Sequence, residues 1–157
     1  FYFQTIEDKL PKKFDLIISR HVLEHVNDNN KTFRNIYNSL NFDCYTINYF
    51  PSKNHFYSII LRIIGSGLQK KLIKFLRPST SNQTGYRAYF SFCSSTEMKN
   101  LLTSIGFKDI KIKNYYRATD YFAFFFPLYL IIGIIEYLFE KFSISYFASG
   151  IIISAKK

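Results

Sequence analysis

A change of hydrophobic period within residues 14–26 constrains the fold of this chain more than any other feature. Residues 14–19 read FDLIIS, and a short β-branched run of this kind is typical of a buried strand in a parallel sheet. Residues 22–26 then place apolar side chains at helical spacing, and Asn27–Asn29 close the segment. The segment therefore predicts a strand that leads directly into a helix.

The polar residues at the end of this predicted strand are Ser19, Arg20 and His21. In open α/β sheets, ligands bind outside the carboxyl ends of the strands. These three residues are therefore the first candidates for a binding site.

The same residues resemble a known family. FDLIIS followed by RHVLEHV is similar to the fourth strand and following helix of class I S-adenosylmethionine-dependent methyltransferases. The resemblance covers nearly the whole chain but only the second half of that fold, so the glycine-rich cofactor loop is expected upstream of Phe1. It implies an α/β, Rossmann-like sheet that is truncated at its N-terminus, with a mixed strand arrangement and an antiparallel last strand.

The resemblance also implies a cofactor, S-adenosylmethionine, and roles for particular residues. Ser19, Arg20 and His21 would border the methionine end of the cofactor. Thr5 stands in the approximate place of an acid that ends the third strand of the family, and Ile6 stands in the place of its apolar neighbour, where both would contact the adenosine. The alternative for Thr5 and Ile6 is an ordinary surface loop.

His21 is the candidate general base, because a neutral imidazole can accept a proton near physiological pH. The alternative is that His21 only caps or packs the start of the helix. Glu24 and His25 belong to the HVLEHV signature, and we interpret both as structural, with His25 hydrogen-bonded inside the domain.

The remaining periodic segments follow in the order that the resemblance requires. Lys31–Leu40 has helical spacing, and Asn41 and Asp43 stand where the family has a Pro-Gly-Gly turn. The other predicted elements are a strand at Cys44–Phe50, a helix at Thr96–Ile105, a strand at Phe107–Lys113 and a last strand at Ala148–Ala155. Ser94 or Ser95 would cap the helix at Thr96–Ile105, with Glu97 near the capping-box position and Gly106 ending the helix.

Two apolar stretches, residues 52–92 and 115–147, are predicted to be lid-like insertions in this single domain. Phe56–Leu76 has apolar residues at helical intervals and a basic polar side, which fits a lid helix or a helix on an anionic membrane. Tyr121–Ile135 is uncharged and shorter than the roughly twenty residues of a membrane span. Glu136 and Glu140 follow at i, i+4 spacing and suggest a helix with one side exposed to solvent. A buried helix, a substrate gate and an interfacial anchor remain open, and packing on the domain is preferred.

The formal net charge of +10 suggests a nucleic acid or an anionic membrane as partner. AT-rich codon bias explains the abundance of Lys, Asn, Ile, Phe and Tyr equally well. The chain lacks the aromatic-basic signature of an RNA-binding sheet, so no nucleic-acid partner is expected. Cys44 and Cys93 stand apart without CxxC spacing, and they indicate neither a disulfide scaffold nor a structural zinc site.

The residues His21, Glu24 and His25 also match H-x-x-E-H, the inverted zinc-peptidase motif. That chemistry needs a third ligand, for which Glu97 is available. The motif directly follows a predicted buried strand, and helix capping explains Glu97 without a metal. We therefore expect no metal site and prefer methyl transfer, with the peptidase and a non-catalytic basic binding module as alternatives.

The sequence thus predicts a methyltransferase that acts on an unknown acceptor, of hydrophobic or lipid-linked type, while small-molecule and glycan acceptors stay open. No secretory signal is recognisable, so a cytoplasmic location is expected. Peripheral association with an anionic membrane surface is a further expectation.

Overall fold

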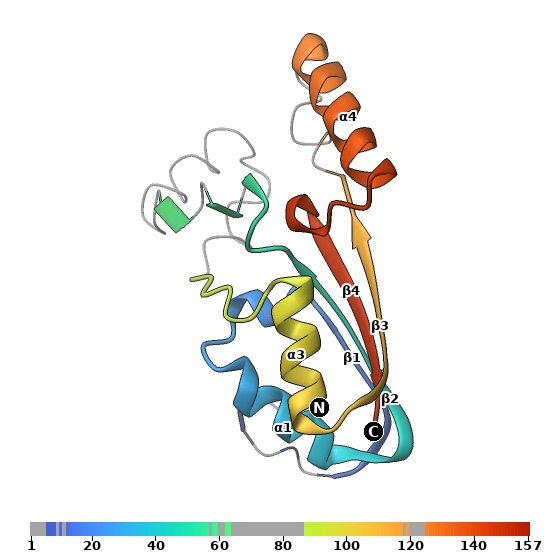
Figure 1. The fold of residues 1–157 in the computed structure, drawn as a ribbon. Helices are drawn as coiled ribbons and strands as arrows, with labels where there is room; N and C mark the ends of the chain where they lie inside the picture. The colour runs from blue at the N-terminus through green and yellow to red at the C-terminus, as the bar shows by residue number, and fades with distance from the viewer. Residues whose placement is uncertain are drawn as a thin grey trace.

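The fold is built on a four-stranded mixed sheet with the strand order β1-β2-β4-β3 (Figure 1). The computed structural model describes residues 6–8, 10, 12–56, 58–59, 62–63, 87–117, 119 and 125–157. β1 (Phe14–Arg20) pairs in parallel with β2 (Leu40–Pro51). β4 (Gly150–Lys156) lies between β2 and β3 (Lys108–Tyr115) and is antiparallel to both. The predicted antiparallel last strand is confirmed.

Two helices, α1 (Asn29–Ser39) and α3 (Ser95–Ile105), cover one face of this sheet (Figure 1). Asp28 caps α1 by accepting a hydrogen bond from the backbone N–H of Lys31 at 3.0 Å. Ser94 caps α3 in the same way, as predicted. Gly106 ends α3 with a φ of 108°, a left-handed conformation that glycine adopts at little cost.

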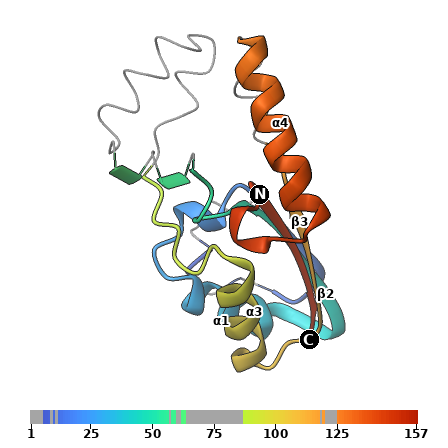
Figure 2. The same cartoon turned by 45° about the horizontal axis from the view of Figure 1, so that its top comes forward.

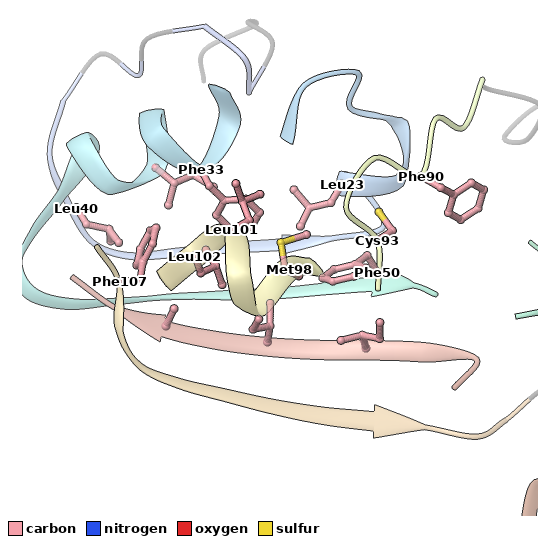
Figure 3. Packing of buried hydrophobic residues seen from close by; sticks show 14 residues of the cluster. Leu23, Phe33, Leu40, Phe50, Phe90, Cys93, Met98, Leu101, Leu102 and Phe107 are labelled. Atoms are coloured by element: carbon pink, nitrogen blue, oxygen red, sulfur yellow. The ribbon is translucent and has the colours of Figure 1, made fainter. Parts of the chain in front are cut away.

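The hydrophobic core lies between these two helices and the covered face of the sheet (Figure 3). Phe33 of α1 and Met98 and Leu102 of α3 are fully buried against Ile151 and Ile153 of β4. Alternate residues along a strand point to opposite faces, which is why Ile151, Ile153 and Ala155 share the core side.

The opposite face of the sheet is open within the part of the chain that the structure describes. The side chain of Ile18 is 65% exposed, and Leu16, Tyr45 and Ile47 are also exposed on this face. The expectation that residues 16–19 form a strand is confirmed, but the expectation that it is fully buried is wrong. Among the described residues, the cover on β1 lies on the face that carries Ser19.

Two local predictions need correction. The apolar positions of residues 22–26 form a single 3₁₀ turn, η1 (Leu23–His25), instead of a longer helix, because Val26 is already extended. α1 passes directly into β2 at Leu40, so the expected turn at residues 41–43 is absent. Asp43 nevertheless adopts a φ of 66°, the left-handed conformation anticipated at this point.

The carboxyl-terminal part contains a helix that extends away from the sheet, α4 (Phe126–Lys141), followed by the 3₁₀ turn η4 (Ser145–Phe147) (Figure 2). α4 contributes no residue to the core cluster among the described residues, and most of its large apolar side chains are exposed, so the structure shows no core packing of this helix. Its packing as a lid stays a prediction. The prediction that Glu136 lies on a solvent-exposed side of the helix is wrong, because Glu136 is only 8% exposed.

The other predicted insertion falls mainly outside the described residues. Residues 56, 58, 59, 62 and 63 are described and helical, and the rest of the predicted helix 56–76 lies outside them. The lid-like role of residues 52–92 and 115–147 stays a prediction.

Candidate functional site

His21 lies where β1 ends, at the edge of the sheet that also holds the carboxyl end of the parallel strand β2. Its backbone N–H donates to the carbonyl oxygen of Tyr49 at 2.9 Å, and its ring meets the Tyr49 ring edge to face at 4.9 Å. The backbone of His21 is left-handed, with a φ of 54°. A non-glycine residue in this conformation costs of order 1–3 kcal/mol, and such residues cluster at functional sites.

A buried carboxylate contacts the ring of His21. Nδ1 of His21 lies 3.3 Å from Oε1 of Glu24, and the His21 side chain is 50% exposed while residue Glu24 is 4% exposed. The Glu24 carboxylate can therefore accept a hydrogen bond from Nδ1–H of His21, which leaves Nε2 as the ring nitrogen that can accept a proton. This pairing is the geometry of a histidine base with an orienting acid.

The second oxygen of Glu24 is an orphan. Oε2 is buried and has no hydrogen-bond partner among the described residues. A buried polar atom without a partner costs about 1–3 kcal/mol, and more when it is charged, so it requires an explanation.

The chain holds Glu24 and His25 in place through the segment before α3. The carbonyl oxygen of Glu24 accepts from the backbone N–H groups of Tyr89 at 2.8 Å and Phe90 at 3.1 Å. Nδ1 of His25 lies 2.9 Å from the carbonyl oxygen of Arg87. The prediction that His25 is hydrogen-bonded inside the domain is confirmed.

Ser19 points into the covered side of the sheet. Its hydroxyl donates to Oδ1 of Asn48 at 2.7 Å, and Nδ2 of Asn48 donates to Oγ1 of Thr46 at 2.9 Å. The hydroxyl of Thr46 then donates to the carbonyl oxygen of Ile17 at 3.1 Å. All three side chains are buried, so the hydroxyl of Ser19 joins β1 to β2 inside the domain. Its predicted cofactor contact is untested and receives no support from this position.

The other predicted cofactor-binding residues have different positions. Arg20 is exposed at the carboxyl end of β1. Ile6 is partly buried against the core cluster, and Thr5 lies outside the described residues. Sequence reasoning missed Glu7, whose Oε1 accepts from the backbone N–H groups of Asn27 and Asp28, each at 2.9 Å. Glu7 thereby fixes the segment of Ile6 beside the loop that follows η1.

A pocket of about 360 Å³ lies beyond the carboxyl end of β2. It is lined by Lys53, Asn54, Ser94, Ser95, Thr96, Glu97, Ser145 and Tyr146. Lys53 forms an ion pair with Glu97, and the hydroxyl of Ser94 donates to Glu97 at 3.0 Å. Glu97, the third zinc ligand of the alternative hypothesis, is thus engaged in capping and in an ion pair. Among the described residues, no group of three or more His, Cys, Asp or Glu side chains could hold a metal ion.

Two further titratable groups lie inside the domain. Burial, assisted by the nearby Glu24 carboxylate, raises the pKa of the Cys93 thiol, so this thiol stays protonated and unreactive. Burial lowers the pKa of His55 to about 4, so its imidazole is neutral at physiological pH.

The sheet, the helices on one face and the polar residues at the strand ends define an α/β domain of Rossmann-like type. A family model described as a methyltransferase domain matches residues 2–112 of the 157-residue chain. The chain belongs to this methyltransferase-domain family. No curated protein matches the sequence at a significant level.

Solved structures support the same fold. The chain is similar to an S-adenosylmethionine-dependent methyltransferase from Thermotoga maritima, described as a possible histamine N-methyltransferase, with 15% identity, a TM-score of 0.55 and coverage of 98% of this chain and 61% of that one. A second methyltransferase, from Archaeoglobus fulgidus, has 17% identity, a TM-score of 0.55 and coverage of 100% and 66%. The chain therefore spans less than two thirds of the length of either.

A third similar structure contains ligands. It is phosphoethanolamine N-methyltransferase 2 from Haemonchus contortus in complex with phosphomonomethylethanolamine and S-adenosylhomocysteine. The identity is 16%, the TM-score is 0.51, and the match covers 96% of this chain and 34% of that one.

Proposed function

We propose that the protein transfers a methyl group from S-adenosylmethionine, with His21 as the general base. The observation that carries this proposal is the pair of His21 and buried Glu24 at the open end of β1, in a chain that belongs to a methyltransferase-domain family. Ligands of open α/β sheets bind at this edge.

The residues at this edge suit one side of a site for that cofactor. Arg20 is exposed and offers guanidinium donors to a carboxylate such as that of the methionine moiety. Ile6 and the loop that Glu7 holds supply an apolar and a backbone surface nearby.

S-adenosylmethionine supplies a methyl group that its sulfonium already makes electrophilic. The chain itself then needs to position the acceptor and remove its proton. Nε2 of His21 would accept the proton from an acceptor N–H or O–H group, and Glu24 would stabilise the resulting imidazolium at Nδ1.

The class of acceptor is also a proposal. We infer a hydrophobic or lipid-linked acceptor, because the exposed apolar helix α4 lies next to η4, whose Tyr146 lines the otherwise polar pocket beyond β2. Small polar acceptors are the competing class. The lid-like role of residues 52–92 and 115–147 and a cytoplasmic location belong to the same proposal.

Isothermal titration calorimetry of the full-length protein with S-adenosylmethionine and S-adenosylhomocysteine tests the cofactor. His21→Gln and His25→Gln form a matched pair, because both residues lie in the same short motif and His25 bonds the carbonyl of Arg87. We expect binding by the wild type and both variants without added metal. In a methyl-transfer assay with an accepted substrate, His21→Gln should lower kcat by about 10²–10⁴-fold, and His25→Gln much less.

Absence of cofactor binding by the folded protein would contradict the proposal. One bound zinc per chain, lost in both histidine variants, would support the peptidase instead. Equal activity of the wild type and His21→Gln would remove His21 from the chemistry and leave the cofactor assignment intact.

A further inference from the structure

The polarity of α4 is reversed relative to an ordinary surface helix. Surface helices turn their apolar stripe inward and their charges outward. In α4 the only charged residue before Glu140 is Glu136, which is buried and whose Oε2 accepts from the backbone N–H of Thr119 at 3.1 Å. The exposed side is apolar and contains Phe126, Tyr129, Leu130, Ile131, Ile134, Ile135, Tyr137 and Leu138.

These exposed residues form a broad surface. At 100° per residue they spread over about two thirds of the helix circumference, whereas packing against one neighbouring helix needs a stripe of about 100°. Aromatic side chains lie at both ends of the surface, with Phe125 and Phe126 at the start and Phe142, Tyr146 and Phe147 after the end. We call residues 125–147 the apolar arm.

The length of α4 decides how it can meet a bilayer. Its 16 residues extend over about 24 Å, less than the roughly 30 Å of a hydrocarbon core. No helix among the described residues is long and apolar enough to span a membrane. An apolar helix of this length can lie along the bilayer interface with its apolar side toward the acyl chains.

The charge of the chain distinguishes a bilayer from a second copy of the same chain. The net charge is +10, and residues 52–92 contain Lys and Arg but neither Asp nor Glu. Lys141 lies in the last turn of α4, and Arg117 is exposed at the end of β3 beside η4, where its backbone N–H donates to Ser149 Oγ. Two copies would bring like charges together, whereas an anionic lipid surface attracts basic segments by about 1 kcal/mol per Lys or Arg.

We propose that the apolar arm lies in the interface of an anionic lipid bilayer. Figures 1 and 2 show α4 extending beyond the end of the sheet at which β1, β2 and β3 all end. The proposal concerns a surface and does not depend on methyl transfer, since lipid binding is measured without cofactor.

The chain contains no Trp, so a single introduced Trp reports on one position only. Ile134→Trp places the probe on the exposed side of α4, where residue 134 is among the most exposed apolar positions. Phe42→Trp is the matched control, because Phe42 is 84% exposed and lies at the start of β2, at the other end of the sheet. Both variants are titrated with phosphatidylcholine vesicles that contain about one third phosphatidylglycerol, with and without brominated acyl chains.

We expect vesicles to shift the emission of the Ile134→Trp protein to the blue and brominated chains to quench it, while the Phe42→Trp protein shows neither effect. Lower partitioning into purely zwitterionic vesicles, and release by salt, would support the anionic part of the proposal. The double substitution Ile131→Asp with Ile134→Asp should weaken partitioning about tenfold or more, and Phe42→Asp should not. Circular dichroism establishes that each variant is folded.

No quenching of the Ile134→Trp protein at any vesicle concentration would overturn the proposal. A blue shift without vesicles, accompanied by a doubled mass in sedimentation, would also overturn it and assign the face to a second copy. Equal partitioning into neutral and anionic vesicles would overturn the electrostatic part.

Discussion

Nδ1 of His21 lies 3.3 Å from Oε1 of Glu24, and the two side chains have opposite exposure. The imidazole is half exposed at the end of β1, while the carboxylate is buried beneath it. The two residues are three positions apart in the sequence. The left-handed backbone of His21 turns the chain directly into η1, and this turn places the Glu24 side chain beside the His21 ring. An exposed base that is held by a buried acid is the relationship on which the proposed chemistry depends.

Glu24→Gln tests the acid while preserving its shape. The amide cannot stabilise an imidazolium as the carboxylate does, so kcat should fall, by less than in His21→Gln. The melting temperature should not fall, because the buried charge with its orphaned oxygen carries a desolvation cost that the neutral amide avoids. Thermal unfolding and steady-state kinetics are the measurements. A variant that loses stability and activity together would show that Glu24 is structural.

Gly150→Ala tests the packing behind His21. A Cβ atom at residue 150 would lie 2.9 Å from Cε2 and the hydroxyl oxygen of Tyr49, so the Tyr49 ring must move. The same ring packs against His21. Forcing this change should cost about 1–3 kcal/mol of unfolding free energy and disturb the imidazole environment.

The double variant Gly150→Ala with Tyr49→Leu is the control, because the shorter side chain removes the clash. Urea unfolding should show that it recovers most of the lost stability, relative to Tyr49→Leu alone. If the loss persists in the double variant, the contact between Gly150 and Tyr49 is not its cause.

Ser19→Ala separates folding from binding. The substitution leaves Oδ1 of the fully buried Asn48 without its donor, at a cost of about 1–3 kcal/mol in unfolding free energy. Affinity for the cofactor should change less than twofold, because the hydroxyl lies inside the domain. A large loss of affinity in a normally stable variant would instead restore Ser19 to the binding site.

The outcome at Ser19 shows how far the sequence could define the site. The strand, its parallel pairing and the position of His21 at its end followed from the period change at residues 14–26. The inward direction of Ser19 could have been found from the two-residue alternation of β1, since Ile17 and Ser19 share one face. The contact between Glu7 and the loop at Asn27 joins distant segments, and no local pattern predicts such a contact.

The same limit explains α4. The apolar run and the two glutamates predicted a helix, and Glu140 is indeed exposed. The side on which Glu136 lies depends on Thr119 at a distant position in the chain, so helical periodicity alone assigned it wrongly to water. Contacts between distant residues could be predicted only for the sheet, because the resemblance to a known fold gives its strand arrangement.

His55 makes stability depend on pH. Its pKa is about 4 in the folded protein and about 6.5 for an ordinary imidazole. Well above pH 6.5, the imidazole of His55 is neutral in both the folded and the unfolded protein. As the pH falls from 6.5 to 4, the unfolded chain binds a proton that the folded chain excludes, so stability decreases through this window. Urea unfolding between pH 7.5 and 4.5 should show the decrease, and His55→Leu should show a smaller one. Identical slopes in both proteins would contradict the assignment.

The most direct test of the account is a nuclear magnetic resonance titration of the histidine rings. The chain has three histidines, His21, His25 and His55, so each ring gives a resolvable signal. Addition of S-adenosylhomocysteine to the metal-free full-length protein should shift the signal of His21 most and leave that of buried His55 unchanged. If no ring responds to the cofactor product, or if the signals of His21 and His25 respond only to zinc, the proposed methyltransferase site at the end of β1 is wrong.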